Sequence, residues 1–173
     1  MNIPNEAWLP AAPDLTSGSL CRSADQLLRV VKQFDVENAA RYQPQKDSSG
    51  RIARTFCNIF AADCLQALGV SAPLHWWMAS ELVANTMKPW LDQHGKAYGW
   101  TCIIEADARA QASAGCPVMA LWRNPAGEGH VAIVLPSPAD GPTIIAQAGA
   151  KCFVGGPLEN GFGDRKPEFW AHG

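Results

Sequence analysis

The pattern of apolar residues changes at Gly115, and this change constrains the fold more than any other feature of the chain. Before Gly115, apolar residues recur every three or four positions, which is typical of helices. After it, short apolar runs alternate with turn residues, which is typical of antiparallel strands. Helices followed by strands predict an α+β fold in which the N-terminal helices pack on an antiparallel β-sheet.

Four helices are predicted, over residues 23 to about 38, 56–68, 78–86 and 104–114. Ser23 and Gln26 have the spacing of a capping box at the start of the first helix. Thr55 is the expected N-cap of the second helix, which places Cys57 in its first turn. Pro89 is expected to end the third helix, because proline lacks the N–H that a helix interior needs.

Four strands are predicted as an antiparallel meander, over residues 118–122, 130–135, 143–147 and 151–154. The polar stretch 43–50 contains proline and glycine and is predicted to be a loop. Residues 1–22 are predicted to be an extended N-terminal arm and residues 23–173 a single domain, since no repeat or linker divides the chain. The last five residues are expected to form a packed tail.

Charge and hydropathy exclude several classes of protein. The formal net charge is −2, so no basic face for nucleic acid is expected. No apolar run is long enough to span a bilayer. Residues 1–13 lack the basic start and apolar core of a Sec signal peptide, so we expect synthesis in the cytoplasm and any export by another route.

The six cysteines are too dispersed for a disulfide framework, although a Cys102–Cys152 bridge is compatible with the sequence. The chain has no C-x-x-C pair and no H-E-x-x-H motif, so no metal and no cofactor are expected. Cys57 begins a predicted helix, where N–H groups and the helix dipole favour a thiolate nucleophile. The alternative is a buried structural thiol, which is the expectation for Cys64 in mid-helix.

His130 opens a predicted strand after a glycine-containing turn, where an imidazole can act as general base for Cys57. Gln147, near the end of the next strand, can lie beside His130 and orient its ring by accepting a ring N–H. The alternatives for this third role are Glu128, Asn160 and His172.

The order of these residues resembles the papain-like NlpC-like and CHAP amidase families, as do the alanine-rich helix, the run GCPVMALW and the run GHVAIV that follow one another. The resemblance implies a papain-like fold and a triad of Cys57, His130 and Gln147 that cleaves amide bonds in peptidoglycan. It also implies substrate contacts by Tyr42, upstream of the nucleophile, and by Asn58, next to it.

This resemblance extends from about residue 42 to residue 148. NlpC-like enzymes usually have Asp-Cys-Ser-Gly at the nucleophile, whereas this chain has Cys57-Asn58-Ile59 after a phenylalanine. Asp63-Cys64 matches the family dipeptide, but the helix after it is too short. The Cys-Asn start is more similar to phage lysins and to amidase effectors of type VI secretion. Such proteins imply delivery to a periplasm or cell wall, and effectors imply a cognate inhibitor protein in the producing cell.

The sequence therefore predicts a peptidoglycan hydrolase that cleaves an amide bond in stem or cross-link peptides through a Cys-His-polar triad. Two alternatives stay open: a papain-like protease or deamidase that acts on a protein, and a non-catalytic module that binds the cell wall. Replacement of Cys57 separates the binding module from the enzymes, because binding alone needs no thiol.

Overall fold

The computed structural model describes residues 23–70 and 83–173 of the 173-residue chain, so the predicted N-terminal arm lies outside the described residues. The described part is an α+β fold with five α-helices and antiparallel sheets, as predicted. Its helices are α2 (Ala24–Gln33), α3 (Cys57–Ala67), α4 (Ala84–His94), α5 (Glu105–Ser113) and α6 (Leu158–Phe162), with the 3-10 helix η2 (Gly95–Tyr98) after α4.

The larger sheet has six antiparallel strands in the spatial order β3-β8-β4-β5-β6-β7. They are β3 (Trp100–Ile103), β4 (Val118–Trp122), β5 (His130–Leu135), β6 (Ile144–Ala148), β7 (Cys152–Pro157) and β8 (Glu168–His172). The predicted meander is confirmed in β4 to β7. Strand β3 lies in a segment that was predicted to be a connection, and β8 lies in the segment that was predicted to be a packed tail. Both form strands because they pair with segments distant in the sequence: β3 with β8, and β8 also with β4.

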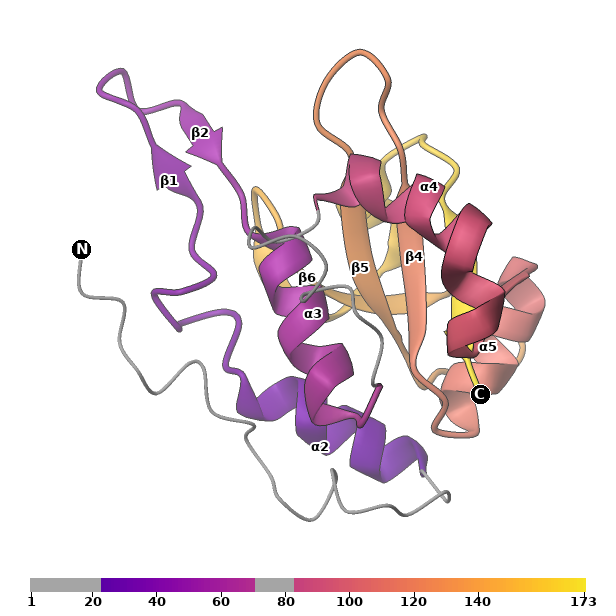
Figure 1. Cartoon of the computed structure of the whole chain (residues 1–173). Helices are drawn as coiled ribbons and strands as arrows, with labels where there is room; N and C mark the ends of the chain where they lie inside the picture. Colours follow the sequence, from indigo (N-terminus) through magenta and orange to yellow (C-terminus); the bar gives the residue numbers. More distant parts are fainter. Residues whose placement is uncertain (1–22, 71–82) are drawn as a thin grey trace.

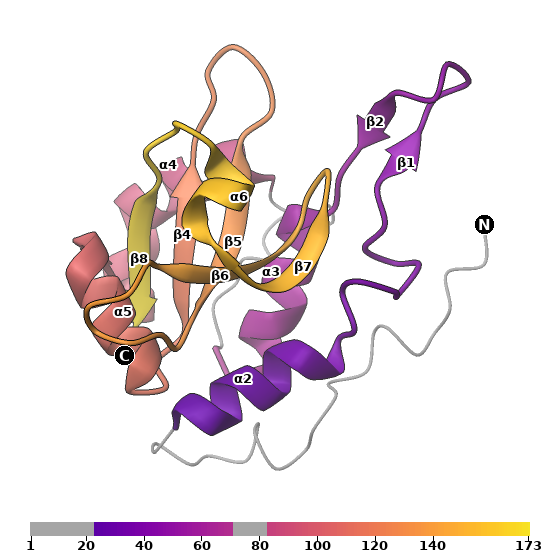
Figure 2. The ribbon, with the colours of Figure 1, turned by 180° about the vertical axis from the view of Figure 1, so that it is seen from behind.

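Helices cover both faces of this sheet. Figure 1 shows α3 and α4 in front of β5 and β4, and Figure 2 shows α6 on the opposite face. Alternation along β5 divides the core accordingly: Val131, Ile133 and Leu135 pack in the cluster that contains α2, α3 and α4, while Ala132 and Val134 pack with α5 and α6. Successive strand residues point to opposite faces, so a single strand serves both cores.

The helix boundaries differ from prediction at two places. The Ser23–Gln26 capping box is present, but α2 ends at Gln33, just before Asp35 takes a φ of 45°. Pro89 lies inside α4 and does not end it; the buried Met87 and Leu91 hold the helix on either side of the proline. The residues predicted to begin that helix lie outside the described ranges.

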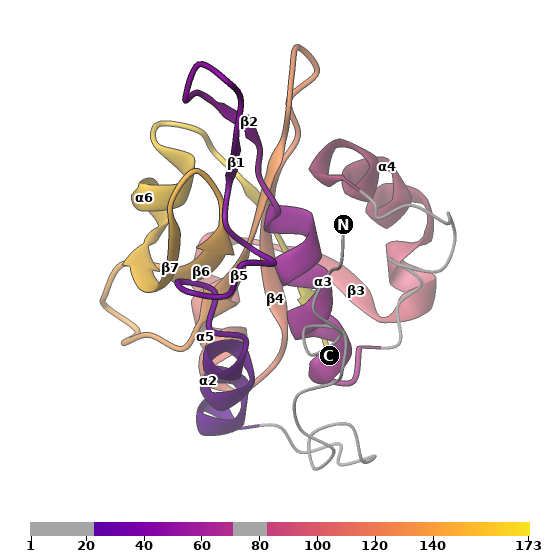
Figure 3. The same ribbon diagram turned by 90° about the vertical axis from the view of Figure 1, so that its left-hand side faces the viewer.

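The predicted loop at residues 43–50 contributes to a small hairpin of β1 (Gln45–Lys46) and β2 (Ile52–Arg54). The Asp47 carboxylate shapes its turn by accepting hydrogen bonds from the backbone N–H groups of Ser49 and Arg51. Figure 3 shows this hairpin and the β4–β5 loop extending from the same end of the molecule. Strand β2 leads directly to the start of α3.

The Cys102–Cys152 disulfide that the sequence left open does not form. Cys102 is in β3 and Cys152 is in β7, which are the two opposite edges of the six-stranded sheet. Both thiols are free, as are those of Cys57, Cys64 and Cys116.

Candidate active site

Cys57 is the first residue of α3, in the first turn as predicted, and its side chain is only 6% exposed. The N-cap is Phe56 and not Thr55, with φ −123° and ψ 32° and no side-chain hydrogen bond to the helix. An uncapped first turn leaves backbone N–H groups available to a thiolate or an oxyanion. Cys64, by contrast, is fully buried in mid-helix, as expected of a structural thiol.

Burial raises the pKa of the Cys57 thiol above its usual value. The nearby backbone N–H groups of Val131, Asn58 and Cys57 itself lower this pKa and oppose the effect of burial, whereas the negative charge of Glu128 adds to it. Removing a thiolate from water costs more than these N–H groups return. Cys57 is therefore a neutral thiol in the free protein and needs a base to become a nucleophile.

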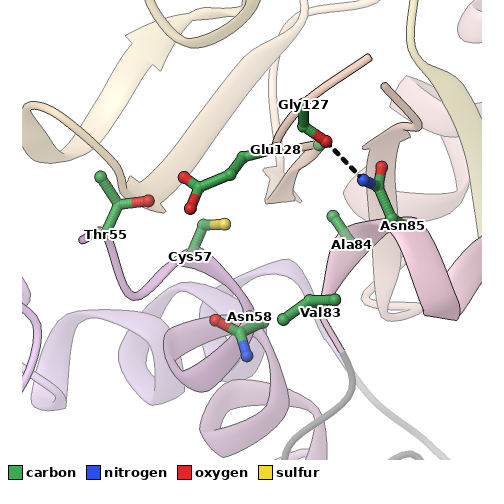
Figure 4. A pocket seen from close by; sticks show the side chains of 9 residues that line it. Thr55, Cys57, Asn58, Val83, Ala84, Asn85, Gly127 and Glu128 are labelled. Carbon is green, nitrogen blue, oxygen red and sulfur yellow. Dashed lines mark hydrogen bonds between the residues drawn. The ribbon is translucent and has the colours of Figure 1, made fainter. Parts of the chain in front are cut away.

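The Cys57 side chain borders a pocket of about 240 Å³. The start of α3, the start of α4 and the β4–β5 loop form this pocket, through Thr55, Cys57, Asn58, Val83, Ala84, Asn85, Gly127, Glu128 and Gly129. Figure 4 shows the Glu128 carboxylate beside the Cys57 sulfur. Asn58 thus lies on the pocket wall next to Cys57, as expected.

Replacing Glu128 with glutamine is expected to make the Cys57 thiol more reactive, because it removes the negative charge beside the sulfur. In water-like surroundings, a neighbouring unit charge is worth at most about 1 kcal/mol. Lower nucleophilicity of the more acidic thiol offsets part of this gain, so iodoacetamide should alkylate Cys57 about two- to threefold faster near neutral pH. The reaction rate is followed by mass spectrometry, with Glu159→Gln, in α6, as the matched control. A slower or unchanged rate in Glu128→Gln would contradict this electrostatic account.

His130 and Gln147 are brought together as predicted: His130 Nε2 lies 2.6 Å from Gln147 Oε1. The Gln147 Nε2 donates to the Lys151 carbonyl at 3.0 Å, which fixes the orientation of the amide. The Oε1 facing His130 can only accept, so Nε2 of the ring carries the proton and Nδ1 keeps a lone pair. The imidazole is thereby held in the tautomer that a general base acting through Nδ1 requires.

Helix α6 closes over this pair. The Phe162 ring lies against the His130 ring with 4.9 Å between centroids. Gly161 packs so closely that a Cβ there would collide with the Gln147 amide oxygen. Both residues restrict the ring and the amide to the observed orientation, which lowers the entropy lost when the hydrogen bond forms. Sequence reasoning missed this contribution, because α6 follows Gln147 only after another strand.

The structure does not bring Cys57 and His130 into direct contact. Within the described residues no hydrogen bond joins the thiol to the imidazole, although the backbone N–H of Val131, one residue after His130, is close enough to lower the pKa of the Cys57 thiol. Strand alternation gives the reason. His130 is on the Ala132 face of β5 with Gln147, while Cys57 packs on the Val131 face. Cys57 and His130 approach each other only at the start of β5.

The pKa of His130 is lowered, mainly by burial and also by the positive charge of Arg165, although the bond to Gln147 raises it. We expect an NMR titration to place this pKa below the usual value of about 6.5. Because the unfolded chain then binds its proton at higher pH than the folded one, the contribution of neutral His130 to stability is present above about pH 6.5 and is lost as the pH falls through the folded pKa. The stability difference between wild type and His130→Gln should shrink over that window; a difference that grows would contradict the assignment.

Asn85 is a site residue that sequence reasoning missed. Its Nδ2 donates to the carbonyls of Asn124 at 3.0 Å and Gly127 at 2.7 Å, and its Oδ1 accepts from the Asn124 N–H at 2.8 Å. Figure 4 shows the bond to Gly127 at the pocket wall. One side chain therefore holds the β4–β5 loop, and with it Glu128, against α4. No local motif marks this role, because the partners are about forty positions apart.

Tyr42 does not line the pocket, contrary to the prediction. Its side chain is 1% exposed and packs edge-on against Phe34 and Phe60. Its hydroxyl donates to the Asp63 carboxylate at 2.8 Å, which also pairs with Arg41 at 2.9 Å. The Asp63 side chain is thus a buried structural anchor, and its burial explains why Asp63-Cys64 offers no catalytic site.

The alternatives to Gln147 lie elsewhere. His172 pairs with Trp100 in β3, and its backbone N–H donates to the Pro117 carbonyl, just before β4 begins. His130 pairs with Trp122, at the other end of β4, so the two histidines are far apart along the sheet. Asn160 is exposed on α6, and Glu128 is beside the sulfur.

These features define an α+β protein with a helix-terminal cysteine at a pocket and an oriented histidine at the start of a neighbouring strand. No protein-family model matches the chain, and no curated protein is significantly similar to it. Over the described ranges, no helix is long and apolar enough to cross a bilayer, and no three His, Cys, Asp or Glu side chains gather as metal ligands would.

Proposed function

We propose that this chain is a papain-like cysteine hydrolase that cleaves an amide bond in the stem or cross-link peptides of peptidoglycan. The observation that carries the proposal is the hydrogen bond between His130 and Gln147, which leaves Nδ1 of the ring unprotonated. A neutral thiol and a neutral imidazole are the resting partners that general-base catalysis needs. The sequence resemblance to NlpC-like and CHAP amidases supplies the substrate class.

In the proposed mechanism, the Cys57 sulfur attacks the amide carbonyl carbon while its proton passes to His130 Nδ1. The C–N bond then breaks, and the Nδ1 proton goes to the leaving amine. Water attacks the resulting thioester, gives a proton to Nδ1, and releases the carboxylic acid as the thiol regains that proton. N–H groups of the uncapped α3 start stabilise the oxyanion in both steps. The first transfer runs through one water or follows a rotation of the Cys57 side chain, because Phe162 and Gln147 hold the His130 ring. Catalytic contacts often tighten only when substrate binds.

Digestion of isolated peptidoglycan tests this proposal. Purified protein should release soluble fragments, each with one new amine and one new carboxylate, and their masses identify the cleaved bond. A protein substrate in place of peptidoglycan tests the protease alternative with the same protein. Absence of any fragment would contradict the proposal.

A non-catalytic wall-binding module is the second candidate, and the missing thiol–imidazole hydrogen bond favours it. In that case the protein should sediment with intact peptidoglycan, and Cys57→Ala should bind as well as wild type. The delivered-effector or lysin role, with an inhibitor protein that covers the pocket, rests on the resemblance. Co-purification of a partner that blocks iodoacetamide labelling of Cys57 would support it.

A further inference from the structure

Arg165 lies in the segment between α6 and β8, with its guanidinium carbon 4.7 Å from the centroid of the Trp122 ring. Its Nη1 donates to the Phe162 carbonyl at 3.3 Å. Stacking on an aromatic face and a backbone hydrogen bond hold the planar group in one orientation. The side chain is exposed, so the guanidinium is anchored and still open to solvent.

Both anchors of Arg165 are neighbours of the proposed base. Trp122 is the register partner of His130 in the β4–β5 pair, and the Phe162 ring lies against the His130 ring. The guanidinium is therefore positioned beside the imidazole, close enough for its charge to disfavour protonation of the ring.

Most N–H donors of the Arg165 guanidinium make no hydrogen bond to a described residue. Only one of its five N–H groups bonds to a described residue, and no carboxylate of the described residues lies within ion-pair distance of it. Arg41 and Arg109, in contrast, are paired with Asp63 and Glu105. An anchored, unpaired cation beside a base opposes the protonation that catalysis requires, and a bound anion would remove that penalty.

We propose that Arg165, held on Trp122, binds a carboxylate of the substrate on the leaving-group side of the cleaved bond. This inference rests on the proposed function, because His130 gives its proton to the leaving amine and so marks the side on which the leaving group lies. The fork of the guanidinium matches the two oxygens of a carboxylate. The enzyme therefore prefers substrates whose leaving peptide carries a free carboxylate near the new amine.

Binding of two dipeptides to the full chain carrying Cys57→Ala tests the inference without any need for turnover. The probes are L-lysyl-D-alanine and its C-terminal amide, which differ in one negative charge. Calorimetry should show the free acid binding about tenfold more tightly, as one charge-assisted contact predicts. Arg165→Gln should remove the preference, and Arg165→Lys should keep part of it. Lys166→Gln, which changes the adjacent exposed cation, should leave it intact.

Equal affinity for both dipeptides, no binding of either, or an undiminished preference in Arg165→Gln would overturn the inference. Arg165→Lys serves as the second variant if Arg165→Gln unfolds at a lower temperature than wild type. Failure here is distinguishable from failure of the proposed function, because release of peptidoglycan fragments by the wild type is measured separately. If the protein digests peptidoglycan but shows no preference for the free carboxylate, only the proposed Arg165 subsite is wrong and the proposed function stands.

Discussion

Replacing Cys57 with alanine is expected to abolish hydrolysis, with a loss on the order of 10⁵-fold or more relative to wild type. The variant removes the sulfur that forms the acyl-enzyme in the proposed mechanism, and no other described thiol borders the pocket. Loss of a nearly buried sulfur leaves a small cavity, so the stability change should be modest beside the activity change. Fragment release from peptidoglycan, followed by chromatography and mass spectrometry, measures the effect.

Cys102→Ala is the matched control, because Cys102 is exposed on β3 and away from the pocket. It should retain wild-type activity. Cys57→Ser adds a second test: it keeps a hydroxyl at the same place, but a neutral hydroxyl beside an uncharged imidazole is a far weaker nucleophile than a thiol. Equal fragment release by wild type and Cys57→Ala would show that Cys57 is not the nucleophile.

Replacing His130 with alanine is expected to lower kcat by about 10²- to 10⁴-fold, the range typical of a lost general acid–base. Gln147→Ala should give a smaller loss, because the ring stays in place but its tautomer is no longer fixed. The two effects should not add: once His130 is alanine, removing Gln147 costs little more, since both act through the same ring. Activity of the two single variants and the double variant completes this cycle.

Glu128→Gln separates His130 from the competing base. If the Glu128 carboxylate beside the sulfur were the proton acceptor, its replacement would reduce kcat by as much as His130→Ala. Under the proposed mechanism, kcat falls only in the histidine variant. Asn160→Ala, on the exposed side of α6, is the control for the third triad position and should leave kcat unchanged.

The features of the site that depend on nearby residues could be predicted from the sequence. The strands at residues 118–122 and 130–135 have the predicted bounds, since apolar alternation and flanking turns specify them without distant partners. The spacing of two adjacent strands placed Gln147 beside His130, because neighbouring antiparallel strands bring such positions together. Cys57 lies at a helix start for a similarly local reason.

Features that depend on contacts between distant segments could not be predicted from the sequence. Tyr42 is buried because Asp63 and two phenylalanines enclose it. Asn85 is tied to a loop forty residues away.

The sequence by itself determined which segments are helix or strand in the centre of the domain, and which residues could carry the chemistry, because periodicity and spacing act over a few residues. Only the tertiary structure decided on which face of β5 each group lies. It set His130 with Gln147 under α6 and Cys57 on the opposite side, since long-range packing and strand pairing choose the neighbours of each residue.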